Sequence, residues 1–272
     1  FEGLSRFQDY LQQTHFFETF SALNKNKKHM LTLYGLPSCA GLRSPSPWVM
    51  KVELALRYFG LNYSLVQPQI VRAVFASPSR KVPHLLIDSE PFVESERILM
   101  VLERYAAPLT FPHPDDEDKV SGIALVRLVE DHLYHIICKS KHADPDTTKI
   151  MWAEMFPYPW FPAGLWTKLM QRLMWKRRLA NTSIGGLTDD EVREEAQKDI
   201  QTLVAQLSKT NFIASDSLTM YDFTVAAHIA SILYWSIDNW LAPLFREHQV
   251  FYHYLDRVSG AVGGFDYKLP RS

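Results

Sequence analysis

Several familiar signals are scarce in this sequence. Only two of its 272 residues are cysteines, Cys39 and Cys138, and their spacing forms neither a CxxC motif nor a zinc-ligand pattern. So few cysteines fit a reducing, cytoplasmic compartment. The formal net charge is −1 at pH 7, so the chain lacks the basic excess with which proteins neutralise nucleic-acid phosphates. The sequence therefore gives no support for a nucleic-acid partner.

Long hydrophobic runs and a targeting segment are also missing. No apolar stretch reaches the roughly 18 residues expected of a transmembrane helix. No basic segment of the signal-peptide kind stands at the start. A metal site is not expected either, because ligand spacing is absent at the histidines His84, His113, His142, His228, His248 and His253.

What is present favours two domains behind an N-terminal extension. The length suits two domains, and 47% hydrophobic residues are enough for a sizeable core. Residues 1–29 are expected to form the extension, and an amphipathic helix is suggested there by the spacing of Leu4, Phe7, Leu11, Phe16 and Phe20.

The first domain, residues 30–106, has the pattern of a mixed sheet with helices. Strands are predicted at 31–35, 62–67, 84–88 and 91–94, and helices at 47–59 and, with Ser95 as its N-cap, from 96 to about 105. The first strand–helix–strand unit should be a parallel crossover. The turn at Ser89-Glu90 is too short for a crossover, so the last two strands should be antiparallel. A mixed four-stranded sheet with helices on both faces is the thioredoxin-like arrangement.

The second domain, residues 116–272, is expected to be all-helical and to follow a linker at 107–115 that is rich in proline and acid. Capping boxes are expected to open two of its helices, at Thr188 and at Thr219. The final residues, from Val262, read as a tail. Helical periodicity covers roughly residues 116–142, 147–156, 163–180, 188–208, 219–236 and 239–258.

Two dipeptides in the first domain suit a peptide-like ligand. A cis bond at Val82-Pro83 would turn the Val82 backbone out of the sheet, where it could pair with an extended peptide, although an ordinary trans proline is the more common reading. Glu94-Ser95 lies where a strand ends and a helix begins. The helix N-terminus and the Ser95 hydroxyl suit a carboxylate, and Glu94 suits an ammonium group, although Ser95 could be a plain N-cap.

The run KVPHLLIDSEPFVESERILMVLE, which contains both dipeptides, resembles the signature of the glutathione S-transferase superfamily. SPWVMKVELALRYFGLNYSLV and SLTMYDFTVAAHI resemble other segments of that family, and the second half is similar to its failed-axon-connections and metaxin-like branch. The resemblance implies a glutathione transferase with glutathione as co-substrate. It implies that Val82 and a cis Pro83 hold the cysteinyl unit, and that Glu94 and Ser95 hold the γ-glutamyl end.

Family members activate the thiol with a Tyr, Ser or Cys near the start of the first helix, and Ser46, directly before Pro47, is the best match. Ser44 and Cys39 compete with it in a long loop, as does Ser38. Cys39 could instead form a mixed disulfide with glutathione, as omega-like members do. A further alternative is Tyr34, although it reads better as a strand residue packed on the core.

A second-substrate pocket for a hydrophobic small molecule is expected beside the first helices of the second domain. Its candidate residues are Tyr134, His135, Lys139 and Trp152. His135 and Lys139 share a helix face and could bind an anion, although a solvent-facing pair is the simpler reading. Ordinary helix packing explains the cluster around Trp152 equally well.

Three further questions stay open at this level. The resemblance leaves undecided whether the chain forms a homodimer, as many relatives do. Trp166 to Arg178 has the pattern of a membrane-surface helix, but a buried helix ending in cations is the favoured reading. The alternative function is that of a non-catalytic interaction protein on the same fold, as in metaxin-like relatives.

Overall fold

The structure is a computed structural model that describes residues 30–67, 81–112, 114–142, 145–155, 173 and 177–268. The expected N-terminal helix lies outside the described residues, as does most of the helix expected at 163–180. Among the described residues, no helix combines the length and the apolar character that crossing a bilayer requires.

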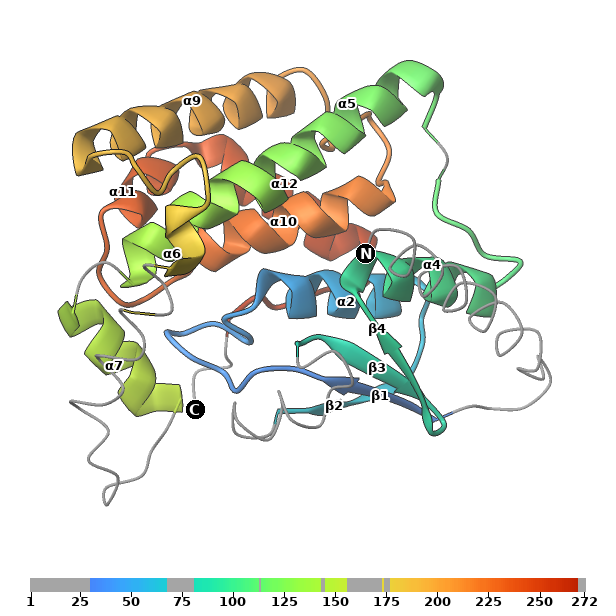
Figure 1. Ribbon diagram of the computed structural model, residues 1–272. Helices are drawn as coiled ribbons and strands as arrows, with labels where there is room; N and C mark the ends of the chain where they lie inside the picture. The colour runs from blue at the N-terminus through green and yellow to red at the C-terminus, as the bar shows by residue number, and fades with distance from the viewer. Residues whose placement is uncertain are drawn as a thin grey trace, which may run out of the picture. The chain divides into compact units, whose positions relative to one another are not determined.

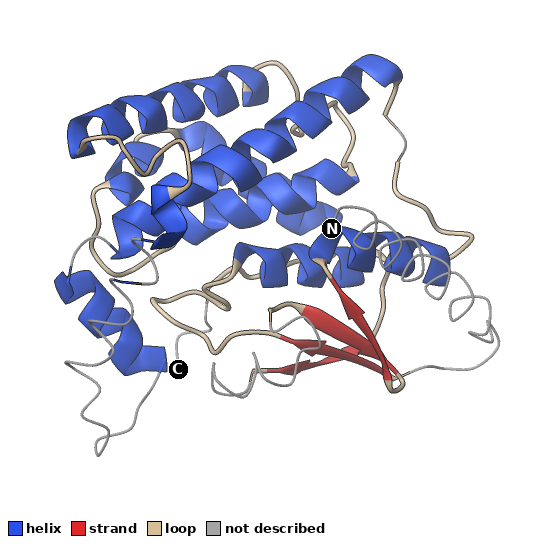
Figure 2. Cartoon of the chain, in the orientation of Figure 1, coloured by secondary structure: helices blue, strands red, loops and turns tan. Residues whose placement is uncertain are grey.

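The four expected strands form one mixed sheet (Figures 1 and 2). Strand order is β2-β1-β3-β4. As expected, β1 and β2 pair in parallel, while β3 pairs antiparallel with both β1 and β4. The bounds are Leu31–Tyr34 for β1, Tyr63–Val66 for β2, His84–Ile87 for β3 and Glu90–Val93 for β4.

Helices α2 (Pro47–Tyr58) and α4 (Ser95–Tyr105) lie on the same face of this sheet (Figure 1). Residues 68–80, which connect β2 to β3, lie outside the described residues, so a helix on the opposite face stays a prediction. The start of α4 differs by one residue from expectation, because Glu94 is the N-cap and Ser95 is already helical.

Helix α2 begins and ends where the sequence predicts. Ser46 is its N-cap and Pro47 its first residue, a position where the missing N–H of proline costs nothing. At the other end Gly60 has φ +63°, which a glycine adopts without strain. Its conformation lets the Leu61 N–H reach the Leu56 carbonyl at 2.9 Å, so a helix-end carbonyl is satisfied.

The second half is helical, and α10 packs against α2, which lies between it and the sheet (Figure 1). The expected helix at 116–142 is continuous but contains a π-helical segment, η1. The expected helix at 239–258 is wrong, because the chain breaks at His248, whose backbone is extended at φ −105°, ψ 103°. The bounds are Asp116–Arg127 for α5, Leu128–Leu133 for η1, Tyr134–His142 for α6, Pro145–Met155 for α7, Asp189–Leu207 for α9, Met220–Leu233 for α10, Leu241–Arg246 for α11 and Gln249–Ala261 for α12.

Residues 262–268, the described part of the expected tail, are not free. The carbonyl of Tyr267 accepts a hydrogen bond from the Arg43 N–H at 3.0 Å, and Lys268 forms a β-bridge with Leu42. Phe265 and Tyr267 are both buried. The segment therefore covers the loop that leads into α2, a contact that local sequence patterns could not reveal.

Both expected capping boxes are present, and the one at α10 is buried. The Asp222 carboxylate accepts hydrogen bonds from the Thr219 N–H at 2.8 Å and the Ile213 N–H at 2.7 Å. It also accepts one from the Tyr254 hydroxyl at 3.0 Å. In the exposed box at α9, the Thr188 N–H donates to Glu191 at 2.7 Å.

The last four carbonyls of α10 are also all satisfied. Backbone N–H groups of Tyr234 and Trp235 bond two of them, and side chains bond the other two. The Lys141 ammonium donates to the Ser231 carbonyl at 2.9 Å and lies 3.9 Å from the centre of the Trp235 ring. Arg246 donates to the Leu233 carbonyl at 3.2 Å. These cations complement the negative end of the helix dipole.

Replacing Asp222 should be far more harmful than replacing its exposed counterpart. Asp222→Ala strands the buried N–H groups of Ile213 and Thr219, each costing about 1–3 kcal/mol, so we expect a loss of about 3 kcal/mol or more. Glu191→Ala, at the exposed box, should cost much less, because water can satisfy the exposed Thr188 N–H once the carboxylate is removed. Urea unfolding of both variants measures the two losses, and equal losses would contradict the burial argument.

Lys141 should make stability depend on pH. Burial lowers the pKa of this lysine from 10.5 to about 8, and no carboxylate pairs with it within the described residues. The folded protein therefore releases this proton at lower pH than the unfolded chain does, so the contribution of Lys141 to stability rises as pH increases above 8.

The unfolding free energy of wild type, measured relative to that of Lys141→Met, should therefore increase by roughly 1 kcal/mol between pH 7 and 9. Lys139→Met provides the control, because Lys139 is on the same helix but only partly buried, and its difference from wild type should not grow in this way. Denaturant titrations at the two pH values measure these differences. A difference between wild type and Lys141→Met that does not change with pH would contradict a lowered pKa of Lys141 in the folded protein.

Candidate functional site

Three segments meet at one edge of the sheet because of its register. Tyr34, the last residue of β1, pairs with His84, the first residue of β3, and His84 pairs with Val93, the last residue of β4. This row of paired residues places the start of the loop to α2 beside Val82-Pro83 and beside Glu94-Ser95. The edge therefore brings Val82-Pro83 and Glu94-Ser95 together with the start of the loop that leads to Ser46.

The Val82-Pro83 peptide bond is cis, as predicted. Pro83 is buried, and Val82 lies outside the strand pairs. No hydrogen bond of the Val82 backbone is found within the described residues, so its N–H and C=O are available to a ligand. Next to it, His84 stacks on Tyr34 with 4.3 Å between ring centres. Tyr34 is therefore packed on a strand neighbour, which favours the structural reading of this residue.

Glu94 and Ser95 form the start of α4 in a conformation that is uncommon for these residue types. Glu94 has φ +64°, a left-handed value that non-glycine residues seldom adopt outside functional sites. The Ser95 hydroxyl makes no hydrogen bond within the described residues. The Glu94 carboxylate lies 3.6 Å from the Lys81 ammonium, and both side chains are more than half exposed. Such a pair is weak, so the ammonium group of a ligand could replace Lys81.

At the start of α2 the Ser46 hydroxyl is also free. Ser46 is the N-cap in residue position, but its side chain makes no capping hydrogen bond. Its competitor Ser44 is fully buried, and the Ser44 hydroxyl accepts the Ser46 N–H at 3.3 Å. Because Ser46 is the N-cap of α2, its free hydroxyl lies next to the positive end of the helix dipole.

Cys39 is buried in a hydrophobic cluster with Leu42, Met151 and Trp235. Burial, and then the nearby Glu154 carboxylate, raise the pKa of the Cys39 thiol to about 12. The thiol points at the Met151 carbonyl, 3.7 Å away. Each of these features opposes a thiolate, so the structure disfavours Cys39 as a nucleophile or as a partner in a mixed disulfide.

Sequence reasoning missed the contacts that hold the loop in front of α2. The fully buried Glu53 carboxylate accepts hydrogen bonds from Arg43 at 2.9 Å and from the Tyr63 hydroxyl at 2.7 Å. The Gln67 amide donates to the Arg43 carbonyl at 2.9 Å. These contacts tie the loop to α2 and to β2. The sequence does show a charged residue, Glu53, inside a largely apolar helix, but this pattern does not identify the residues that pair with it.

Of the expected second-substrate residues, Tyr134 comes closest to the start of α2. Its ring meets that of Trp48 edge-on, with 4.3 Å between centres. Lys139 is engaged elsewhere, because its ammonium donates to the Leu187 carbonyl at 2.9 Å and pairs with Asp189 at 3.3 Å. The side chain of Trp152 lies outside the described residues. Lys139 therefore does not enter our proposal as a pocket residue.

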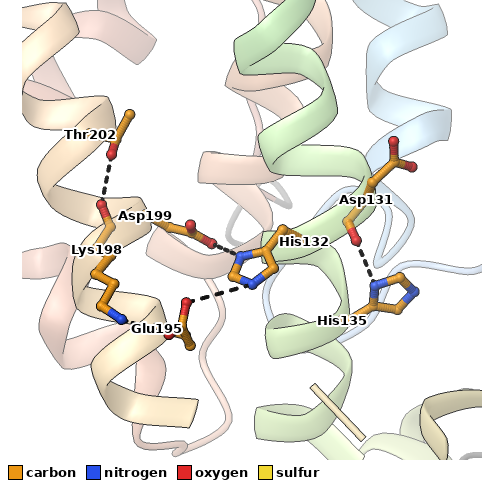
Figure 3. A network of polar contacts seen from close by, with 7 residues as sticks. All are labelled: Asp131, His132, His135, Glu195, Lys198, Asp199 and Thr202. Carbon is orange, nitrogen blue, oxygen red and sulfur yellow. Dashed lines mark hydrogen bonds and ion pairs between the residues drawn. The ribbon is translucent and has the colours of Figure 1, made fainter. Parts of the chain in front are cut away.

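His135 and its neighbour His132 are both held by contacts within the helical half (Figure 3). The His135 ring is hydrogen-bonded to the Asp131 carbonyl at 2.8 Å, one turn earlier. His132 contacts Asp199 at 2.8 Å and Glu195 at 3.9 Å, so it joins η1 to α9. Of the expected basic pair, His135 is thus bonded to the preceding turn of its own helix, and Lys139 to the residues at the start of α9.

A residue that the sequence did not indicate is His228 on α10, which lies behind Trp48. The two ring centres are 5.5 Å apart. Nδ1 of His228 bonds the Thr224 carbonyl at 2.8 Å, and the fully buried Nε2 has no hydrogen-bond partner among the described residues. Burial lowers the pKa of His228 to about 3, so the ring is neutral. With Tyr134 and Trp48 it forms an aromatic group beside the start of α2.

The burial of both cysteines predicts that neither reacts in the folded protein. Burial raises the pKa of Cys138 to about 11, and Cys39 is equally inaccessible. At pH 8, Ellman's reagent should therefore titrate neither thiol in native protein and both in guanidinium chloride. The denatured sample is the internal control. One fast-reacting thiol in the native state, mapped to Cys39, would return that residue to the list of candidate nucleophiles.

Comparison with known proteins agrees with this fold. Residues 47–147 match the family model described as glutathione S-transferase N-terminal domain. The curated protein Failed axon connections of Drosophila melanogaster is 25% identical over 222 residues, which cover 78% of this chain and 52% of that protein. The chain thus spans about half the length of this relative.

Solved structures share the fold at low sequence identity. Glutathione S-transferase III in its apo form superimposes with a TM-score of 0.55 at 17% identity, over 89% of this chain and 99% of that one. Glutathione S-transferase-I bound with lactoylglutathione gives 0.53 at 16% identity, over 86% and 96%. The chain therefore shares the fold of these glutathione S-transferase structures, with a thioredoxin-like N-terminal half and a helical C-terminal half, and its residues 47–147 are similar to their N-terminal domain.

Proposed function

We propose that this protein binds glutathione at the sheet edge and uses its thiolate on a hydrophobic electrophilic or oxidised small molecule. The observation that supports this most directly is the row of pairs Tyr34, His84 and Val93, because this register sets two of three candidate ligand-binding groups beside each other and beside the start of the loop that leads to the third. These groups are the free Val82 backbone, the free Ser95 hydroxyl at a helix N-terminus, and the free Ser46 hydroxyl.

Each group has a role that matches its chemistry. The Val82 N–H and C=O would pair with the cysteinyl unit as a neighbouring strand does. Ser95 and the N-terminus of α4 would hold the γ-glutamyl carboxylate, and Glu94 its ammonium group. Ser46 would donate a hydrogen bond to the sulfur. Trp48 and Tyr134 would offer the second substrate an aromatic wall.

Bound glutathione supplies the nucleophile: its thiol loses a proton, and the sulfur bonds to the electrophilic carbon as the leaving group departs. The protein favours the thiolate through the Ser46 hydroxyl and the positive end of α2. Lowering a thiol pKa from about 9 to about 6–7 requires roughly 3–4 kcal/mol at 1.36 kcal/mol per pKa unit. A charge-assisted hydrogen bond and a helix terminus supply amounts of this order.

A non-catalytic role as an interaction protein is the second candidate. The similarity to Failed axon connections favours it, because the name of that protein states no enzymatic activity. A turnover assay distinguishes the two functions, since both allow glutathione binding but only the first requires turnover.

The Ser46 hydroxyl should control the thiol and not the affinity. Ser46→Ala should raise the pKa of bound glutathione, followed by thiolate absorbance near 240 nm, by about 1–2 units. Turnover at pH 7 should fall by about 10- to 100-fold, while the glutathione Kd changes little. Ser95→Ala should do the opposite and weaken binding by about tenfold with little change in the thiol pKa.

Ser44→Ala is the matched control in the same loop, because the Ser44 hydroxyl is already used by the Ser46 N–H. If Ser44→Ala rather than Ser46→Ala moves the thiol pKa, Ser44 takes over the catalytic role. Absence of glutathione binding to the wild type in calorimetry would reject the proposed function outright. Binding without turnover on a panel of electrophiles and peroxides would favour the interaction protein.

A further inference from the structure

One fully buried cation joins the glutathione site to both halves of the protein. Lys51 lies on α2, and its side chain is 0% exposed. Its ammonium contacts the Glu96 carboxylate on α4, and it contacts Glu130 on η1 at 3.0 Å. Glu130 is 11% exposed and Glu96 is 48% exposed. A buried charge must be paired, so the position of Lys51 and the positions of both carboxylates depend on one another.

The contact with Glu96 falls at a mechanistically sensitive place. Glu96 directly follows Ser95 in the first turn of α4. The N-cap of this helix has no side-chain hydrogen bond, so capping does not fix the first turn. The Lys51–Glu96 contact links that turn to α2, five residues after Ser46.

We propose that Lys51 is a positioning residue for glutathione: through Glu96 it sets the place of Ser95 relative to the start of α2. The inference rests on the proposed function, because it concerns the same ligand site. The role requires no contact between Lys51 and glutathione. A ligand held at its γ-glutamyl end by α4 and at its sulfur by α2 is bound well only if the two helices keep a fixed relation.

The two carboxylates allow a merely structural role to be told apart from a positioning role. Both neutralise the same ammonium, but only Glu96 lies on α4, and Glu130 is the more buried of the two. Loss of Glu130 should therefore cost more stability and leave the first turn of α4 attached. Loss of Glu96 should cost less stability but release that turn.

The experiment measures glutathione affinity by calorimetry and stability by urea unfolding for Glu96→Gln, Glu130→Gln, Lys51→Met and the double variant Lys51→Met/Glu96→Gln. We expect Glu96→Gln and Lys51→Met each to weaken binding about tenfold. The double variant should bind no more weakly than either single variant, because the two residues act as one unit. Glu130→Gln should bind within about twofold of wild type despite its larger loss of stability.

Four results would overturn the inference. Affinities that fall in proportion to stability across all variants would show a structural role only. A further tenfold loss from Glu96→Gln in the Lys51→Met background would show that Glu96 acts on the ligand independently. Wild-type affinity in Glu96→Gln would remove Lys51 from the site while leaving the proposed function intact, whereas a wild type that fails to bind glutathione rejects both. If Lys51→Met does not fold, the contrast between Glu96→Gln and Glu130→Gln still decides.

Discussion

Lys51 and Glu53 are two fully buried charges of opposite sign, two residues apart on α2. Residues at this spacing lie on different sides of a helix and do not face each other. They therefore cannot neutralise one another, and each must find its own partners. Burial of an unpaired charge is among the most costly events in folding, so the surroundings of α2 are constrained on both sides.

Each side of α2 meets this constraint with a different part of the chain. On the Glu53 side, Arg43 and Tyr63 tie the preceding loop to α2 and to β2. The C-terminal residues then cover that loop, because the Arg43 N–H donates a hydrogen bond to the Tyr267 carbonyl. On the Lys51 side, α4 and η1 supply the carboxylates. The free hydroxyls of the candidate site thus lie on segments that are held by the same helix.

Local patterns predicted the parts of this architecture that depend on nearby residues. The start of α2 at Pro47, its end at Gly60 and the antiparallel turn before β4 follow from chemistry within a few residues. The same holds for the capping box at Thr188. The residues of the candidate site could be predicted from the sequence for this reason, since each of its motifs is a short stretch at the end of a strand or helix.

Contacts between residues far apart in the sequence could not be predicted in this way. Lys51 and Glu130 are separated by 79 positions, and nothing in either local pattern names the other. Lys139 looked like a free basic residue, but its partner Leu187 is 48 positions away. The break at His248 has no glycine or proline to mark it; there Phe245 and Phe251 stack with 5.0 Å between ring centres. Tertiary packing decides such cases.

The loop before α2 shows how the environment, and not the residue type, selects the catalytic candidate. Cys39 is intrinsically the better nucleophile, but burial and Glu154 stabilise its protonated form. Ser46 has an ordinary hydroxyl, but this hydroxyl has no partner within the described residues and lies at the positive end of a helix. It cannot serve as a strong nucleophile by itself, yet it can donate to a thiolate that a ligand brings. The proposed function therefore assigns the reactive sulfur to a bound thiol and not to Cys39.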